Sequence, residues 1–238
     1  MSENIKEKTT KAFRVDLDSR ENQSILKPIA RYSFNNQAYQ VDEAPEKIAK
    51  KIYELIKDAK HSNDGIVLNH IKIKEAFFNP FKPQLKNAQV FLSHSHADRN
   101  KALEVKDYLE NQTKRKVFVD SLFWDYKDDV LNKLAEYDDI SRIEDAFTLI
   151  LRESLQDMIE KCPYFVFLQS KNSVSLNQGL SQITYSAWIY EELKIAHSIS
   201  ESRPIPMMES MQVFHDISPF LESFETITLK KLSQQINS

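Results

Sequence analysis

The chain has 238 residues and a net charge of −3, which does not indicate a nucleic-acid-coating surface, since such surfaces are strongly basic. Its composition is that of a globular protein with a buried core, and no stretch approaches the roughly 18 apolar residues that span a membrane. The single Cys162 excludes an internal disulfide, and two glycines, Gly65 and Gly179, are too few for a P-loop or a Rossmann dinucleotide fingerprint.

The N-terminal part predicts a small module. Residues 1–30 are polar and mixed in charge, unlike a secretory signal, and we interpret them as a loose leader of a cytoplasmic protein. Residues 42–60 predict an amphipathic helix, because Pro45 suits a first turn and an apolar stripe follows. Residues 65–78 alternate only in part and fit either a strand or a short helix.

A boundary is predicted near residue 85, where Pro80 and Pro83 interrupt the chain. It separates an N-terminal extension of unknown role, residues 1–85, from a second domain, residues 86–238.

Apolar strands then alternate with helices. We predict strands at 88–92, 116–119 and 164–168, helices at 98–112, 144–161 and 181–198, and an edge strand at 204–208. Residues 121–143 form a long acidic connection without glycine, with a helical patch around 130–134. This alternation predicts an α/β fold in which helices cover both faces of a parallel sheet. Ligands bind beyond the carboxyl ends of such strands, so we expect any binding site to be formed by the loops after Leu92, Asp120 and Leu168.

A first candidate cluster, Ser93-His94-Ser95-His96-Ala97-Asp98-Arg99, follows the strand at 88–92 and enters a helix. Backbone N–H groups and the helix dipole favour anions there. Alternatively, Ser95 or Asp98 caps the helix.

Two other protein classes, zinc hydrolases and receiver domains, match the sequence only in part. His94, His96 and Asp98 match the start of the H-x-H-x-D-H signature of metallo-β-lactamase-like zinc hydrolases, but Arg99 replaces the last ligand. Asp120 ends a strand as the phosphoacceptor of a receiver domain does. Receivers also need an acidic pair after the first strand to bind Mg²⁺, where this chain has serine and histidine.

A second candidate cluster contains Trp188 and Glu192, which share one face of a predicted helix. An indole beside a carboxylate makes a partly desolvated wall, where an anion acts strongly on a nearby cation. Alternatively, Trp188 belongs to the core, and Glu191 and Glu192 are solvated surface residues.

Three features, in this order, resemble TIR (Toll/interleukin-1 receptor) domains over residues 88 to about 230. They are the strand end Phe91-Leu92-Ser93-His94 with Asp98, the segment Val117-Phe118-Val119-Asp120-Ser121-Leu122-Phe123-Trp124, and the helix motif Trp188-x-x-x-Glu192-Leu193. The segment Asp120-Ser121-Leu122-Phe123-Trp124 is especially similar to bacterial TIR proteins of Thoeris-type antiphage defence. The long 121–143 connection departs from the short, glycine-containing loop of the family.

The resemblance implies a flavodoxin-like TIR fold, to which a small helical or α+β N-terminal extension is attached. It implies NAD⁺ as substrate, no cofactor and no metal, with Glu192 as the catalytic carboxylate. Its implied substrate-binding residues are Ser93, His94, Asp120, Trp124 and Trp188.

The resemblance also implies partners. We expect a homo-oligomer built through TIR–TIR contacts, and a separate effector protein that senses an ADP-ribose-derived product, linear or cyclic. Nucleic acid and membrane are not expected partners. The alternative is a TIR scaffold that assembles with other TIR domains without turning over NAD⁺.

Overall fold

The computed structural model describes residues 10–26, 44–58, 60–62, 65–67, 70–137, 144–176, 181–201 and 215–238. The chain divides into two compact units, which are described separately. The sheet unit comprises Met1–Ile29, Ala88–Val119 and Met158–Ser238, and the helical unit comprises Ala30–Asn87 and Asp120–Asp157. The expected division into residues 1–85 and 86–238 therefore differs from this one, because both units take segments from each side of residue 85.

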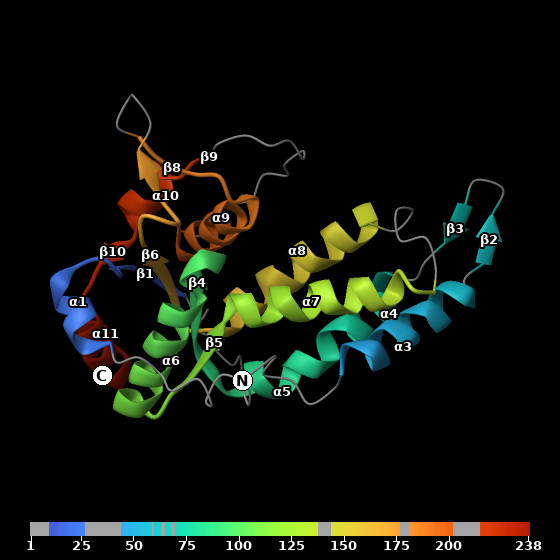
Figure 1. The fold of residues 1–238 in the computed structure, drawn as a ribbon, viewed down its shortest axis with the longest axis horizontal. Coiled ribbons are helices and arrows are strands. Elements are labelled where there is room, and N and C mark those ends of the chain that lie inside the picture. Colours follow the sequence, from blue (N-terminus) through green and yellow to red (C-terminus); the bar gives the residue numbers. More distant parts are fainter. Residues whose placement is uncertain are drawn as a thin grey trace, which may run out of the picture. The chain divides into compact units, whose positions relative to one another are not determined.

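The sheet unit is built on a five-stranded parallel sheet with strand order β10-β1-β6-β4-β5 (Figure 1). The strands are β1 (Lys11–Asp16), β4 (Ala88–His94), β5 (Lys116–Val119), β6 (Tyr164–Gln169) and β10 (Glu225–Thr226). Its helices are α1 (Arg20–Ile25), α6 (Arg99–Thr113), α9 (Ala187–Glu201), α10 (Ser218–Ser223) and α11 (Leu229–Asn237). A second, antiparallel sheet contains β7 (Ser175–Leu176), β8 (Gln182–Thr184) and β9 (His215–Asp216).

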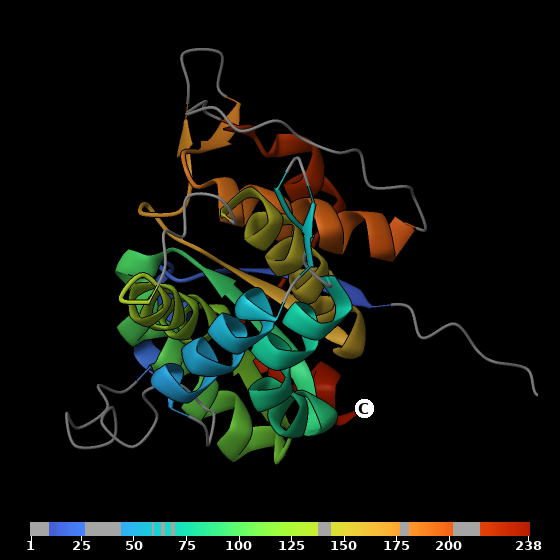
Figure 2. The same ribbon diagram turned by 90° about the vertical axis from the view of Figure 1, so that its right-hand side faces the viewer.

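Helices cover both faces of the parallel sheet. Helix α9 contacts β1 and β4, while α6 contacts β4, β5 and α11. Figure 2 shows α9 on one side of the strands and α6 with α11 on the other. The apolar run at the centre of β4 follows from this cover, since Val90, Phe91 and Leu92 are all fully buried. The predicted α/β class, consistent with a flavodoxin-like fold, is confirmed.

The N-terminal strand β1 lies between β6 and β10, so the interpretation of this segment as a loose leader is wrong. Phe13, Val15 and Leu17 are buried, and the charged residues Arg14 and Asp16 separate them, which is the period-two pattern of a strand. Read from the β5 edge, the strand order is β5-β4-β6-β1-β10. Strands β5, β4 and β6 occupy the first three positions of the flavodoxin-like order 2-1-3-4-5, and the N-terminal strand β1 occupies the fourth.

The helical unit contains two long helices that pack together, α3 (Pro45–Lys57) and α7 (Asp120–Leu134). Its other elements are β2 (Lys60–Ser62), β3 (Gly65–Val67), α4 (His70–Phe78), the 3₁₀ turn η1 (Asn79–Phe81), α5 (Lys82–Asn87) and most of α8 (Glu144–Lys161). Aromatic rings fill its core: Phe81 lies 5.1 Å from Phe123 and 5.3 Å from Tyr126, between centroids.

Most predicted elements are confirmed, and two need correction. The connection predicted at 121–143 begins with the continuous helix α7, which includes the expected helical patch at 130–134. The helix starts earlier than that patch because Leu122, Tyr126 and Val130 make a buried stripe at helical spacing. Helix α9 begins at Ala187 rather than 181, because Gln182–Thr184 pairs as a strand.

Two further predictions meet different outcomes. The segment 65–78, left open between strand and helix, contains both β3 and α4. The edge strand at 204–208 falls outside the described residues. Within the described part of the chain, no helix has the length and apolar character that crossing a bilayer requires.

Candidate functional site

The carboxyl end of strand β4, which lies between β6 and β5, carries two buried polar residues, Ser93 and His94. They follow the apolar run of β4 and precede the 3₁₀ turn η2 (His96–Asp98), which leads into α6. The chain passes from β4 to β5 on one side and meets β6 on the other, so this strand end lies where the strand order reverses. Open parallel sheets bind their ligands at such switch points.

Glu192 reaches this strand end from α9. The helix is started by Ser186, whose Oγ accepts a hydrogen bond from the Ile189 backbone N–H at 3.2 Å. Ile189 and Leu193 are buried beside Glu192, whose carboxylate is itself 0% exposed. The Ser93 hydroxyl donates a hydrogen bond of 2.5 Å to Glu192 Oε2. Two residues from separate predicted clusters are thus joined, and the interpretation of Glu192 as a solvated surface residue is wrong.

His94 is held as a neutral imidazole beside this pair. Its Nδ1 lies 2.6 Å from the Ser95 carbonyl oxygen, which can only accept, so Nδ1 carries the proton. Burial is the largest influence on His94 and lowers its pKa from 6.5, while the charges of Glu192 and Asp98 act in the opposite direction.

Asp98 does not cap the helix that it precedes, and neither does Ser95: no side-chain cap hydrogen bond forms at either residue. The buried Asp98 carboxylate instead accepts hydrogen bonds from Ser170 Oγ and, at 2.9 Å, from Asn172 Nδ2. This clamp ties the loop after β6 to the turn after β4. Ser170 and Asn172 were missed as individual residues, although the loop after Leu168 was expected to face the site.

Trp188 lies one helical turn before Glu192, so the two share a side of α9. Its side chain is half-buried, unlike that of a core tryptophan. Glu191, the neighbouring carboxylate, contacts Lys194 at 3.4 Å.

Asp120 and Trp124 belong to the helical unit, where they open helix α7. Asp120 Oδ1 accepts a hydrogen bond of 2.6 Å from the Ser121 backbone N–H. Trp124 packs edge-on against Phe123 with ring centroids 4.8 Å apart, and Lys127 Nζ lies 5.8 Å from the Trp124 ring. These contacts start and stabilise the helix.

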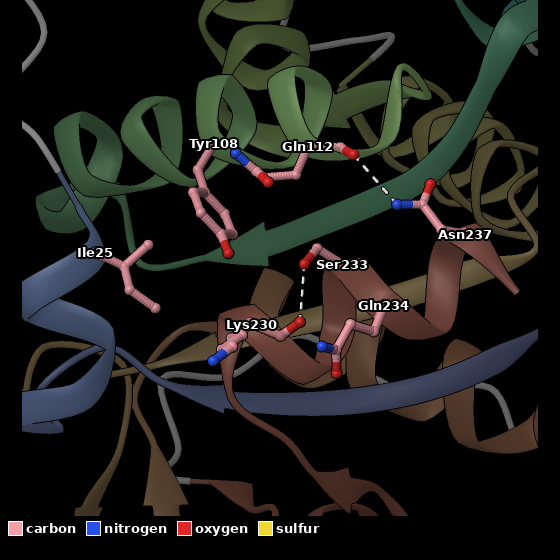
Figure 3. A pocket seen from close by; sticks show the side chains of 7 residues that line it. All are labelled: Ile25, Tyr108, Gln112, Lys230, Ser233, Gln234 and Asn237. Atoms are coloured by element: carbon pink, nitrogen blue, oxygen red, sulfur yellow. Dashed lines mark hydrogen bonds between the residues drawn. The ribbon is translucent and has the colours of Figure 1, made fainter.

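Two surface cavities contain none of the predicted site residues. The cavity in the sheet unit has a volume of about 410 Å³ and is formed by α1, α6 and α11 (Figure 3). Tyr108 and Gln112 face α11 across it, and Asn237 Nδ2 donates to the Gln112 carbonyl at 3.2 Å. Most of its polar lining is exposed. The second cavity, also of about 410 Å³, lies between α3 and α4 of the helical unit.

The zinc-hydrolase alternative finds no support in the donor geometry. Among the described residues, no three His, Cys, Asp or Glu side chains converge as a metal site requires. Asp98, the third residue of that spacing, is engaged by Ser170 and Asn172.

Comparisons of this chain with protein-family models, with curated proteins and with solved structures found no match.

Proposed function

We propose that this protein cleaves the bond between nicotinamide and ribose in NAD⁺, with Glu192 as the carboxylate that stabilises the transition state. The observation that carries the proposal is the buried contact between Ser93 and Glu192 at the carboxyl end of β4. Each residue belongs to a different motif of the TIR resemblance, and 99 positions separate them in the chain.

A single carboxylate suits this chemistry. When the C1′–N1 bond breaks, its electron pair stays with nicotinamide, which leaves as a neutral base and needs no general acid. The ribose then carries the positive charge of an oxocarbenium ion, as in other glycosyl transfers. A fixed anion binds this state more tightly than the substrate, and low polarity around Glu192 strengthens the effect.

The nucleophile decides the product. Attack by water gives ADP-ribose and releases a proton, whereas attack by an adenine nitrogen of the same molecule gives a cyclic isomer. Under this proposal the product is a signal that a separate effector protein senses during antiphage defence. Product chromatography distinguishes the two nucleophiles.

Access to Glu192 requires a rearrangement, because the carboxylate is fully buried. NAD⁺ therefore reaches it only after the residues that cover the carboxylate move. Assembly through TIR–TIR contacts is the step that we propose opens the site, and turnover should rise more than linearly with protein concentration.

The experiment compares NAD⁺ loss and nicotinamide release by the wild type, Glu192→Gln and Glu191→Gln, at high protein concentration. Glu191→Gln is the matched control, since it removes the adjacent carboxylate of the same helix. We expect Glu192→Gln to lose at least about 100-fold in kcat and Glu191→Gln to retain activity. Equal losses in both variants would reject Glu192 as the catalytic residue.

A non-enzymatic scaffold is the second candidate, and the complete burial of Glu192 favours it. A buried carboxylate held by Ser93 would also serve as a link between β4 and α9. In that case the wild type would assemble without consuming NAD⁺, and Glu192→Gln would reduce stability and assembly alone.

A further inference from the structure

We propose that Ser93 is a positioning residue that orients the Glu192 carboxylate, rather than a residue that binds NAD⁺. The inference rests on the proposed function. It differs from the expectation that the TIR resemblance raised, in which Ser93 is a substrate-binding residue.

The geometry of the bond is that of a hydroxyl and a carboxylate. A separation of 2.5 Å between Ser93 Oγ and Glu192 Oε2 falls in the range of charge-assisted O–H···O⁻ hydrogen bonds. Both residues are 0% exposed, so water does not compete for either atom. A serine hydroxyl has one proton to donate, and here Glu192 receives it.

The elements that carry the two residues make the contact rigid. Ser93 lies near the end of β4, where it pairs with Phe167 of β6, and α9 packs directly on β4. The Glu192 side chain has three rotatable bonds, and the bond at Oε2 restricts them. The orientation of the Glu192 carboxylate is then fixed, which a transition-state contact requires.

The neighbourhood of Glu192 makes this donor important. Ile189 and Leu193 of the same helix are buried, and His94 is held in its neutral form. An ionised carboxylate in such surroundings needs a hydrogen-bond donor to offset the cost of leaving water. Ser93 supplies that donor before any substrate binds.

Three substitutions separate hydrogen bonding from volume. Ser93→Ala removes the donor, Ser93→Cys keeps a similar size with only a weak S–H donor, and Ser93→Thr keeps the hydroxyl. We expect Ser93→Ala and Ser93→Cys to lower kcat about 10- to 100-fold, with KM changed less than about threefold. Ser93→Thr, which also suits a strand, should retain more than about a tenth of kcat.

Two kinetic outcomes would overturn the proposal. A raised KM with unchanged kcat in Ser93→Ala would identify Ser93 as a substrate-binding residue, as the sequence suggested. Full activity in Ser93→Cys would mean that only the volume of the side chain matters.

A double-mutant cycle in urea unfolding, with Ser93→Ala, Glu192→Gln and the double variant, tests the bond without any turnover. Non-additive effects support the contact, and additive effects overturn it. Wild-type protein without NAD⁺ cleavage, but with a coupled pair, would reject the proposed function and the positioning role together. Cleavage that needs Glu192 but is insensitive to Ser93→Ala would reject the positioning role alone.

Discussion

Replacing Phe13 by alanine tests whether the N-terminal strand is an integral part of the sheet. The Phe13 ring is 3% exposed, and its residue pairs with Val166 on one side and Glu225 on the other. Truncation of a buried phenylalanine costs about 3–5 kcal/mol. In a protein of this size that loss lowers the melting temperature by roughly 6–20 °C.

The assay is urea unfolding followed by tryptophan fluorescence in a Trp124→Phe background. Trp188 is then the single tryptophan, and it reports on the sheet unit. Lys11→Ala is the control, because Lys11 is an exposed residue of the same strand. A destabilisation by Phe13→Ala no larger than that by Lys11→Ala would refute this reasoning. It would support the interpretation of the N-terminal segment as a loose leader.

Two further predictions concern the residues around the candidate site. Burial lowers the pKa of His94 below 6.5, so the unfolded chain binds this proton more readily, and the free energy of unfolding falls as pH drops below 6.5 toward the folded pKa. His94→Gln should weaken this dependence when urea unfolding is compared at about pH 7.5 and about pH 5.5, and an unchanged dependence would contradict the assignment. Asp98→Ala leaves the donors of Ser170 and Asn172 without their carboxylate, and we expect a loss of about 1.5–3 kcal/mol in the same unfolding assay. A loss below about 0.5 kcal/mol would show that the clamp does not hold the two loops.

Strong local patterns explain which elements could be predicted. Helix α8 has the predicted bounds, because Phe147, Ile150, Leu151 and Met158 repeat at helical spacing. The strands β4, β5 and β6 each contain an uninterrupted apolar run, as buried parallel strands do.

Weak or non-local patterns explain what was missed. Strand β1 has only a few alternating residues in a polar context, and its partner β6 lies far along the chain. In α7, acidic residues on the exposed face obscured the buried stripe of Leu122, Tyr126 and Val130. The absence of glycine there, interpreted as a departure from the TIR pattern, also favours a helix.

The candidate site could be predicted as residues but not as contacts. Motifs singled out Ser93 and Glu192 separately, yet spacing along the chain does not show that a hydroxyl at a strand end meets a carboxylate on a helix. Nor does it show that Asp98 bonds to Ser170 instead of capping its own helix. Both contacts depend on which strands are neighbours, and that is a property of the whole sheet.

The place of β1 in the sheet also determines when this protein can fold during its synthesis. Thr10 bonds to the Cys162 carbonyl 152 positions away, so β1 leaves the ribosome long before the strand beside which it lies. Closing so long a loop is slow, and Phe13 and Val15 stay exposed until it closes. The nascent chain is therefore vulnerable to aggregation throughout that interval.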